Sequence, residues 1–575
     1  MSNPASSKKL NLPTTRLVRA AVVQYKRPLI LVTVLLAILL LVAGLISQSS
    51  EPEPVGGPLM LRRLTEEQYR NSIADIFHAQ VPIVGRFERP FRAEGLISVG
   101  TGKSGMSPFA IEQYDASAQT IAAHVLDPKG RAQFVKCGPK DPKQFDEACA
   151  RSFLSKTGRL LFRRPLTNAE TASYVARARS SAKQLGNFYS GLELSLYTML
   201  VAPEFLFRIE RTSPDFDGTT GVLDAYSKAS RISFFLTNST PDDALLQAAA
   251  AGNLDSDSGV RKQVDRLMQT PRYEDALRAF FADMLHFDTF ADLSKDPEIY
   301  PAYNSEIAQE AQEQTLRTII EHVMTKQGDY RDLFTTRDTF LTRSLGTIYR
   351  TPVPERDEWM PATFAKDANR AGIQSHVSFL ALHSHPGRTS PTLRGYGMRQ
   401  VFLCQDVPDP PATVNFTAIE ADAHKANVTA RDRIAMHASE PSCAGCHKVM
   451  DPLGLAMENY DGLGTFRTRE NGALIDTNGS LDGRNFSTPD SLAKALHDHP
   501  ETPRCVSERL YKSAVGRDIV WKERYYLDWL IKGFADDGYR IPDLMLRIAT
   551  SKNFFAITRA ENVNTAKITT DGGKS

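Results

Sequence analysis

The chain has 575 residues, of which 42% are hydrophobic, so it is too long for one ordinary domain and predicts several. Its 69 Lys and Arg residues nearly balance its 67 Asp and Glu residues, for a net charge of +2. This balance, together with the lack of a basic stripe interleaved with aromatics, argues against a dedicated nucleic-acid binder, so we expect no nucleic-acid partner. Helix-forming residues dominate long stretches and alternating β-type runs are scarce, which predicts a mainly α fold.

The N-terminal segment has the pattern of a membrane anchor. Residues 1–27 hold basic residues and no acid, and an apolar run follows from residue 28 to residue 46. At about 1.5 Å per residue this run nearly spans a hydrocarbon core of roughly 30 Å. We therefore expect one transmembrane helix over 28–47, with the basic tail in the cytoplasm and the bulk of the chain outside. A cleaved signal peptide is the alternative, although no clear small-x-small cleavage site follows the run.

Capping patterns mark the first helices after a flexible linker at 48–57. Thr65 and Gln68 have the spacing of a capping box, and Leu64 with Tyr69 that of a hydrophobic staple. The pair Thr167 and Glu170 repeats the capping-box spacing. Each pattern predicts a helix that begins directly after its threonine.

A third helix start is predicted at residues 240–243. The sequence Thr-Pro-Asp-Asp combines a capping Thr, a Pro at the first helical position and acids in the first turn, and Gly252 predicts the end of that helix. Residues 370–470 differ, because they are rich in Pro, Gly and His, and we expect a loop-rich module there. The predicted organisation begins with a basic tail (1–27), an anchor (28–47) and a linker (48–57). Three helical domains (58–135, 136–215 and 222–350) come next. The loop-rich module (370–470), a C-terminal helical domain (484–556) and a polar tail (557–575) complete it.

Six cysteines are present, and two of them belong to a CxxCH motif at residues 443–447. In an exported protein the other four are free to form disulfides. Cys137 and Cys149 are close enough in sequence to close a short loop, and Cys404 with Cys505 would then tie a late segment to the C-terminal helices. Four cysteines allow three connectivities, so the pairing stays open, as do buried thiols.

The CxxCH motif, Cys443-Ala444-Gly445-Cys446-His447, is the attachment signal for a c-type haem. Two thioether bonds join the cysteine sulfurs to the haem vinyl groups, and His447 is placed to ligate the iron. Attachment takes place outside the cytoplasm, which agrees with the topology above. We therefore expect one covalent haem c on a single-pass protein of a bacterial inner membrane, with its bulk in the periplasm.

Three other interpretations compete with a haem. A thiol-exchange pair usually lies near a βαβ pattern, which is lacking. A zinc site would use His437, Cys443, Cys446 and His447, but adjacent Cys446 and His447 bind one tetrahedral ion awkwardly. A chance match is the third.

The second axial ligand of the iron is less defined by the sequence. We prefer Met457, and His385 and His437 are the rival ligands. Arginines flank the motif in sequence and are either partners of the haem propionates or ordinary surface ion-pair formers, namely Arg388, Arg394, Arg431 and Arg467. Three acids follow the motif closely and are expected to cap or hydrogen-bond the turn after it, namely Asp451, Glu458 and Asp461.

The stretch from Cys443 to Gly464 (CAGCHKVMDPLGLAMENYDGLG) resembles the haem-site stretch of the planctomycete-type cytochrome c-like family. That family strings together several domains of unknown function. Other blocks agree with the resemblance, namely LRRLT at 61–65 with Tyr69, FRRPLT at 162–167, SRISFFL at 230–236 with PDD at 241–243, RTSP at 388–391 with Arg394-Gly395, and VGR at 515–517. The resemblance implies haem binding and electron transfer without naming a substrate. A second CxxCH and a sugar-binding module, which many relatives carry, are lacking in this sequence.

Three functions follow from these observations. The first is an electron-transfer protein, held at the membrane and served by a redox partner protein. The second is a haem-dependent oxidoreductase, because the helical domains before residue 350 are larger than a simple carrier needs. The third is a non-enzymatic envelope scaffold in which the site is structural.

Overall fold

The computed structural model describes residues 50–78, 81–103, 105–354, 358–408, 425–438 and 441–559, without the side chains of 436–438, 441 and 442. The predicted tail at 1–27, the predicted span at 28–47 and residues 560–575 lie outside the described residues. Within the described ranges, no helix combines the length and the apolar character that crossing a membrane requires. The mainly helical fold is confirmed.

The first group of helices precedes residue 207. It consists of α2 (Glu66–Phe77), α3 (Ile97–Gly100), α4 (Pro108–Leu126), α5 (Glu147–Leu161), α6 (Asn168–Leu185), α7 (Phe188–Leu200) and α8 (Pro203–Leu206). Both predicted capping boxes are confirmed, since Thr65 and Thr167 each cap their helix in reciprocal bonds with Gln68 and Glu170.

The second group runs from residue 225 to residue 349. It consists of α9 (Ala225–Thr237), α10 (Asp243–Ala250), α11 (Asp257–Leu267), α12 (Arg272–Met284), α13 (Ser305–Ile320), which continues as a π-helix over Glu321–Thr325, and α14 (Arg343–Tyr349). The start predicted for α10 was two residues early. Asp242 caps this helix by accepting a hydrogen bond from the Leu245 N–H (2.8 Å), while the Thr240 hydroxyl donates to the carbonyl oxygen of Leu160.

The third group follows residue 376 and carries the CxxCH motif. It consists of α15 (Val377–Leu382), α16 (Pro391–Gly397) with a π-helix at Met398–Phe402, α18 (Ala430–Ala438), α19 (Pro441–Leu455), α20 (Pro489–His497), α21 (Glu501–Val515), α22 (Arg524–Asp536) and α23 (Ile541–Thr550).

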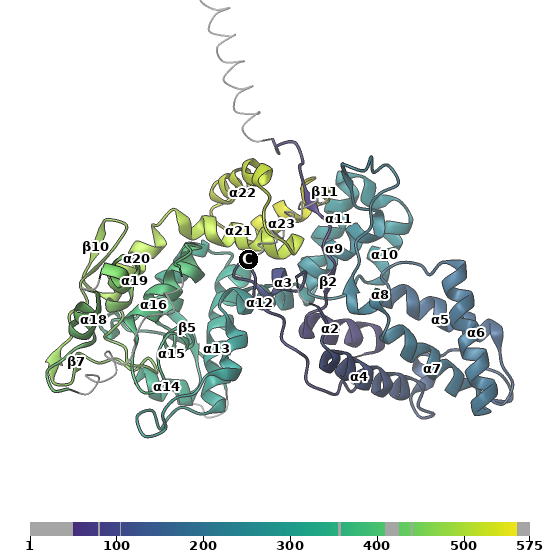
Figure 1. The fold of residues 1–575 in the computed structure, drawn as a ribbon, viewed down its shortest axis with the longest axis horizontal. Coiled ribbons are helices and arrows are strands. Elements are labelled where there is room, and N and C mark those ends of the chain that lie inside the picture. Colours follow the sequence, from purple (N-terminus) through teal and green to yellow (C-terminus); the bar gives the residue numbers. More distant parts are fainter. Residues whose placement is uncertain are drawn as a thin grey trace, which may run out of the picture. The chain divides into compact units, whose positions relative to one another are not determined.

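The described strands are short and join distant parts of the chain. β11 (Ala556–Thr558), which Figure 1 labels, lies between β1 (Gly57–Pro58), with which it pairs in parallel, and β4 (Thr220–Val222), with which it pairs antiparallel. The other pairs are antiparallel, namely β2 (Arg62–Arg63) with β3 (Phe207–Arg208), β5 (Asp338–Leu341) with β6 (Met360–Thr363), β7 (Arg469–Glu470) with β8 (Ala473–Leu474) and β9 (Gly479–Leu481) with β10 (Arg484–Phe486).

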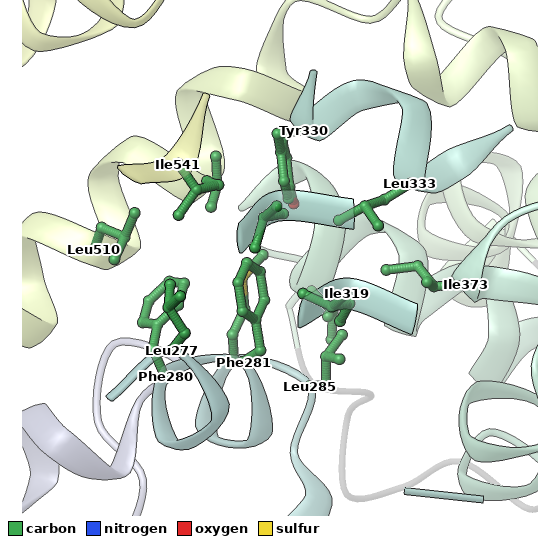
Figure 2. Packing of buried hydrophobic residues seen from close by; sticks show 14 of the residues in the cluster. Leu277, Phe280, Phe281, Leu285, Ile319, Tyr330, Leu333, Ile373, Leu510 and Ile541 are labelled. Carbon is green, nitrogen blue, oxygen red and sulfur yellow. The ribbon is translucent and has the colours of Figure 1, made fainter. Parts of the chain in front are cut away.

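Two large hydrophobic clusters form the interior. One is built from the first helix group, and the other extends from α9 to the segment after α23. Figure 2 shows the second cluster, where Phe281 of α12 lies among Ile319 of α13, Tyr330 and Ile541 of α23. Because this cluster draws on residues both before and after the CxxCH motif, the module that carries the motif is part of a continuous core.

Buried charges connect the first helices to the end of the chain. Glu210 accepts hydrogen bonds from Arg62 (3.1 Å) and Arg231 (2.8 Å), and Arg231 also donates to the carbonyl oxygen of Phe554. Burial opposes ionisation of Glu210, but the guanidinium groups of Arg231 and Arg62 lower its pKa to about 2. The carboxylate therefore stays charged inside the protein.

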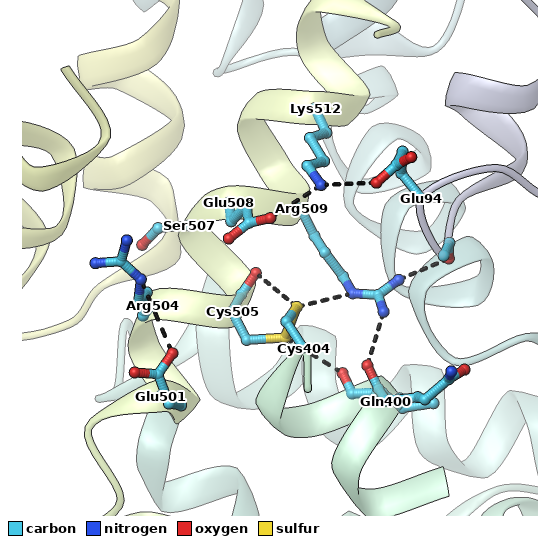
Figure 3. The surroundings of a disulfide bond; sticks show 12 residues. Glu94, Gln400, Cys404, Glu501, Arg504, Cys505, Ser507, Glu508, Arg509 and Lys512 are labelled. Carbon is cyan, nitrogen blue, oxygen red and sulfur yellow. Dashed lines mark hydrogen bonds and ion pairs between the residues drawn. A yellow bond between two sulfur atoms is a disulfide. The ribbon is translucent and has the colours of Figure 1, made fainter. Parts of the chain in front are cut away.

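Both predicted disulfides are confirmed. Cys137 is bonded to Cys149 and Cys404 to Cys505, with Cα atoms 5.6 and 5.2 Å apart. Figure 3 shows that Arg509 of α21 lies beside the second disulfide, where it donates to Cys404 Sγ (3.2 Å) and to the carbonyl oxygen of Gln400 (2.7 Å).

Removing the two disulfides should have unequal effects on stability. The Cys404–Cys505 bond closes a sequence separation of 101 residues and the Cys137–Cys149 bond one of 12. Because loop-closure entropy grows with loop length, changing Cys404 and Cys505 to Ser should lower the free energy of unfolding by about 5 kcal/mol, against about 3 kcal/mol for Cys137 and Cys149. Denaturant unfolding of the two double variants measures this order, and a larger loss for the short loop would contradict it.

Candidate functional site

The CxxCH motif lies on a helix. Cys443, Cys446 and His447 occupy positions i, i+3 and i+4 of α19, and residues at this spacing share one helix face. All three are partly exposed. The sequence predicted a loop-rich module over residues 370–470 and no helix at the motif itself, which the structure shows as α19.

Two glycines and a proline have specific roles in this helix. Pro452 lies near the end of α19, so it removes a backbone donor only from the last turn. A Cβ on Gly454 would lie 1.7 Å from the Pro391 carbonyl oxygen, and one on Gly395 would lie 1.9 Å from the carbonyl oxygen of Met450. The glycines therefore allow α16 to pack directly against α19, and this contact fixes the position of the helix that bears the motif.

Asp451 orients the imidazole of His447. Its Oδ2 accepts a hydrogen bond from His447 Nδ1 (2.7 Å), and its Oδ1 accepts one from the Thr392 hydroxyl (2.8 Å). The His447 and Asp451 side chains are 13% and 7% exposed. A carboxylate only accepts, so Nδ1 carries the proton, and in the neutral imidazole the lone pair is on Nε2. This is the outer-shell arrangement that proteins use to hold a metal-ligating histidine.

The loop after α19 is held by one buried arginine. Arg394 of α16 donates to the carbonyl oxygens of Met457 (2.9 Å), Tyr460 (2.8 Å) and Asp461 (2.6 Å), and it pairs with Glu458 (3.2 Å). Its side chain is fully buried. Arg394 therefore shapes the chain that follows the motif.

Of the acids expected to bond the turn after the motif, Asp461 does so, whereas the carboxylates of Asp451 and Glu458 bond other side chains. Glu458 accepts hydrogen bonds from Thr389 (2.6 Å) and Arg467 (3.1 Å) as well as from Arg394. Burial raises the pKa of Glu458, and the two arginines oppose that rise. Asp461 accepts the N–H groups of Leu463 and Thr465 and so caps the turn, as predicted.

The arginines predicted as partners of propionates have other partners within the protein. Arg394 and Arg467 bond the loop described above, and Arg431 donates to the carbonyl oxygens of Asp476 and Asn478. Arg388 is partly exposed.

The candidates for a second axial ligand lie in different surroundings. Met457 is 1% exposed and packs in the second hydrophobic cluster. His385 is partly exposed, and its carbonyl oxygen accepts a hydrogen bond from Lys295 (3.3 Å). The side chain of His437, on α18, lies outside the described residues. None of these positions identifies the ligand, so Met457 stays a prediction.

The described residues show no group of three or more His, Cys, Asp or Glu side chains arranged to hold a metal ion by themselves. Sequence reasoning missed Thr392, which supports Asp451. It also missed the bond between Asp451 and His447, although their i,i+4 spacing would have revealed it had the motif been placed on a helix.

Changing Arg394 to Met should destabilise the protein by about 3–5 kcal/mol, because the loop loses its donor and Glu458 loses its one fully buried cation and keeps only the partly exposed Arg467. Thermal and denaturant unfolding measure the loss. The double variant R394M/E458L should recover part of it, since it no longer buries an under-compensated carboxylate. A double variant less stable than R394M would contradict this account of the loop.

Comparison with known proteins identifies the chain's domains. Five consecutive segments match family models, each described as a protein of unknown function, namely 62–127 (DUF1587), 149–210 (DUF1595), 223–350 (DUF1592), 370–470 (PSCyt3, DUF1588) and 482–554 (DUF1585). No match was found among curated proteins or solved structures. The five models, in this order, show that the chain belongs to the planctomycete-type cytochrome c-like family of consecutive domains of unknown function.

Proposed function

We propose that this protein carries one haem c, attached through Cys443 and Cys446 with His447 as an axial ligand, and that it transfers electrons at the outer face of a bacterial inner membrane. The observation that carries the proposal is the hydrogen-bonded series Thr392–Asp451–His447, which holds the imidazole of a CxxCH motif in one orientation and tautomer. Membership of a cytochrome c-like family agrees with it.

The residues present fit a covalently attached haem. Both thiols and the imidazole share one partly exposed face of α19. The two disulfides use the other four cysteines, so Cys443 and Cys446 are in the thiol form that thioether formation requires. When bound, haem supplies a one-electron iron couple. Asp451 makes the imidazole more basic, which favours the oxidised state of that couple.

The proposed location rests on the sequence and on the disulfides. The basic N-terminal tail and the apolar run at 28–47 predict a single anchor with the bulk of the chain in the periplasm. Disulfides persist in oxidising compartments, and the structure contains two. The inner membrane would thus be one partner, and a redox protein that reaches the partly exposed motif would be the other.

Haem attachment is tested with the full chain made in cells that carry out cytochrome c maturation. Haem should remain on the chain in a denaturing gel, and the stain should be lost when Cys443 and Cys446 are changed to Ser. The matched control changes Cys137 and Cys149 to Ser and should keep the stain. A wild-type chain without covalent haem would refute the proposal and favour the scaffold function.

Ligand binding separates a carrier from an enzyme. If a protein side chain fills the sixth position, CO and cyanide should leave the absorbance spectrum unchanged. A shift on addition of either ligand would favour the haem-dependent oxidoreductase instead.

Changing Asp451 to Asn should raise the midpoint potential by tens of millivolts, because the imidazole loses a charged acceptor at Nδ1. Spectroelectrochemical titration measures this shift. Thr392→Val should cause a smaller shift of the same sign, and Asp476→Asn, which changes an exposed carboxylate just after the 370–470 module, should cause none. Equal potentials for wild type and D451N would show that Asp451 does not tune His447.

A further inference from the structure

A cavity of about 850 Å³ lies apart from the CxxCH motif. Residues of α2, α9, α12 and α21, together with the segment 86–98, line it, and no residue of the 370–470 module does. Its volume falls within the range of small-molecule sites in proteins. Much of the wall is apolar, with contributions from Phe234, Phe235, Phe280, Phe287, Leu510 and Met545.

Arg208 of β3 is the unusual polar group of this wall. Its side chain is 5% exposed, and its Nε and Nη2 atoms are buried with no hydrogen-bond partner among the described residues. The guanidinium carbon lies 4.5 Å from the centroid of the Phe234 ring, and Glu210 attracts the group electrostatically without accepting a hydrogen bond from Nε or Nη2. An unpaired charge at this depth costs free energy unless a partner arrives.

The charges around Arg208 do not provide that partner. Glu210 is the nearby carboxylate, and it is shared by Arg62 and Arg231. Arg163 adds a further buried cation whose donors bond the carbonyl oxygens of residues 204, 205 and 207. Burial lowers the pKa of Arg208 well below its ordinary value, and the positive charge of Arg62 adds to the effect. Three buried guanidinium groups, those of Arg62, Arg208 and Arg231, thus act on one carboxylate, and Arg163 adds a positive charge near Arg208.

The acids that line the cavity are already bonded elsewhere. Asp283 accepts the N–H groups of Ile97 and Ser98 and a bond from Arg92. Further acids pair with arginines other than Arg208, namely Glu88 with Arg63 (2.8 Å) and Asp292 with Arg89 (2.7 Å). Glu67 accepts from Asn238, and burial raises its pKa, which favours its neutral form. These acids are therefore not hydrogen-bond partners of Arg208 Nε or Nη2, which leaves this part of the cavity wall available to an anion that enters from outside.

We propose that this cavity binds a small organic carboxylate, with its anionic group on Arg208 and its apolar part against the aromatic wall. A guanidinium group is suited to carboxylate oxygens, and the apolar lining selects against a bare inorganic anion. This binding site does not depend on the proposed haem, and its test requires none.

The test follows the thermal unfolding of the purified full chain with benzoate and with hexanoate. Both should raise the midpoint of wild type in a saturable manner and leave that of Arg208→Met unchanged. Benzyl alcohol, the neutral analogue of benzoate, should have no saturable effect on either protein. Arg524→Met, which removes a partly exposed arginine outside the cavity, should respond as wild type does.

Two outcomes of this experiment would overturn the proposal. Equal responses of wild type and R208M to both carboxylates would remove Arg208 from binding. A rise with inorganic phosphate as large as that with benzoate, and lost in R208M, would replace the organic carboxylate with a simple anion.

A second measurement uses wild type alone, in case R208M fails to fold. Phenylglyoxal modifies arginines and has an apolar ring that suits the cavity, so peptide mass spectrometry should detect adducts on Arg208. Benzoate should slow this modification several-fold and leave that of Arg524, which is partly exposed and outside the cavity, unchanged. Modification of Arg208 at the same rate with and without benzoate would contradict the site.

Discussion

The buried carboxylate of Glu210 is the group on which the arrangement of the first domains depends. Glu210 ends the matched domain at 149–210, and it binds Arg62, at the start of the domain at 62–127, and Arg231, in the domain at 223–350. Arg231 also reaches the Phe554 carbonyl oxygen at the end of the domain at 482–554. One ionised side chain thereby joins segments that are hundreds of residues apart, and its low pKa keeps it ionised.

Buried arginines also hold distant segments together elsewhere in the protein. Arg163 bonds the carbonyl oxygens of residues 204–207, Arg394 those of residues 457–461, and Arg509 those of Gly95 and Gln400. A guanidinium group offers five donors in a planar fork, so one side chain satisfies several carbonyl groups of an irregular segment at once. A protein with short strands and many connecting segments needs such donors, because buried carbonyl groups without partners are costly.

The sequence predicted the helix caps and the disulfides of this structure better than its long-range contacts. The capping boxes at Thr65 and Thr167 were predicted correctly, because each depends on local spacing. Of the three pairings that four cysteines allow, the structure has the one that the short separation of Cys137 and Cys149 favours. The helix through the CxxCH motif was not predicted. A glycine such as Gly454 usually indicates irregular structure, but here it is required by the close approach of α16 to α19, and local sequence does not reveal that contact. Among the buried arginines that carry the family resemblance, the sequence indicated a role only for Arg394, as a propionate partner or a surface ion-pair former. The structure buries Arg62, Arg163, Arg231 and Arg394 as cross-links between segments, and such long-range contacts have no signature in a single sequence.

The pairing of β1 with β11 bears on the order in which the protein is made and folded. Gly57 and Pro58 hydrogen-bond to a strand at residues 556–558, and Asn553 accepts the N–H groups of Val55 and Gly56. During synthesis from the N-terminus, these first backbone groups have no native partner until nearly the whole chain has been translated. The earliest part of the domain therefore completes its fold last, and a chain that stops before residue 553 cannot close it.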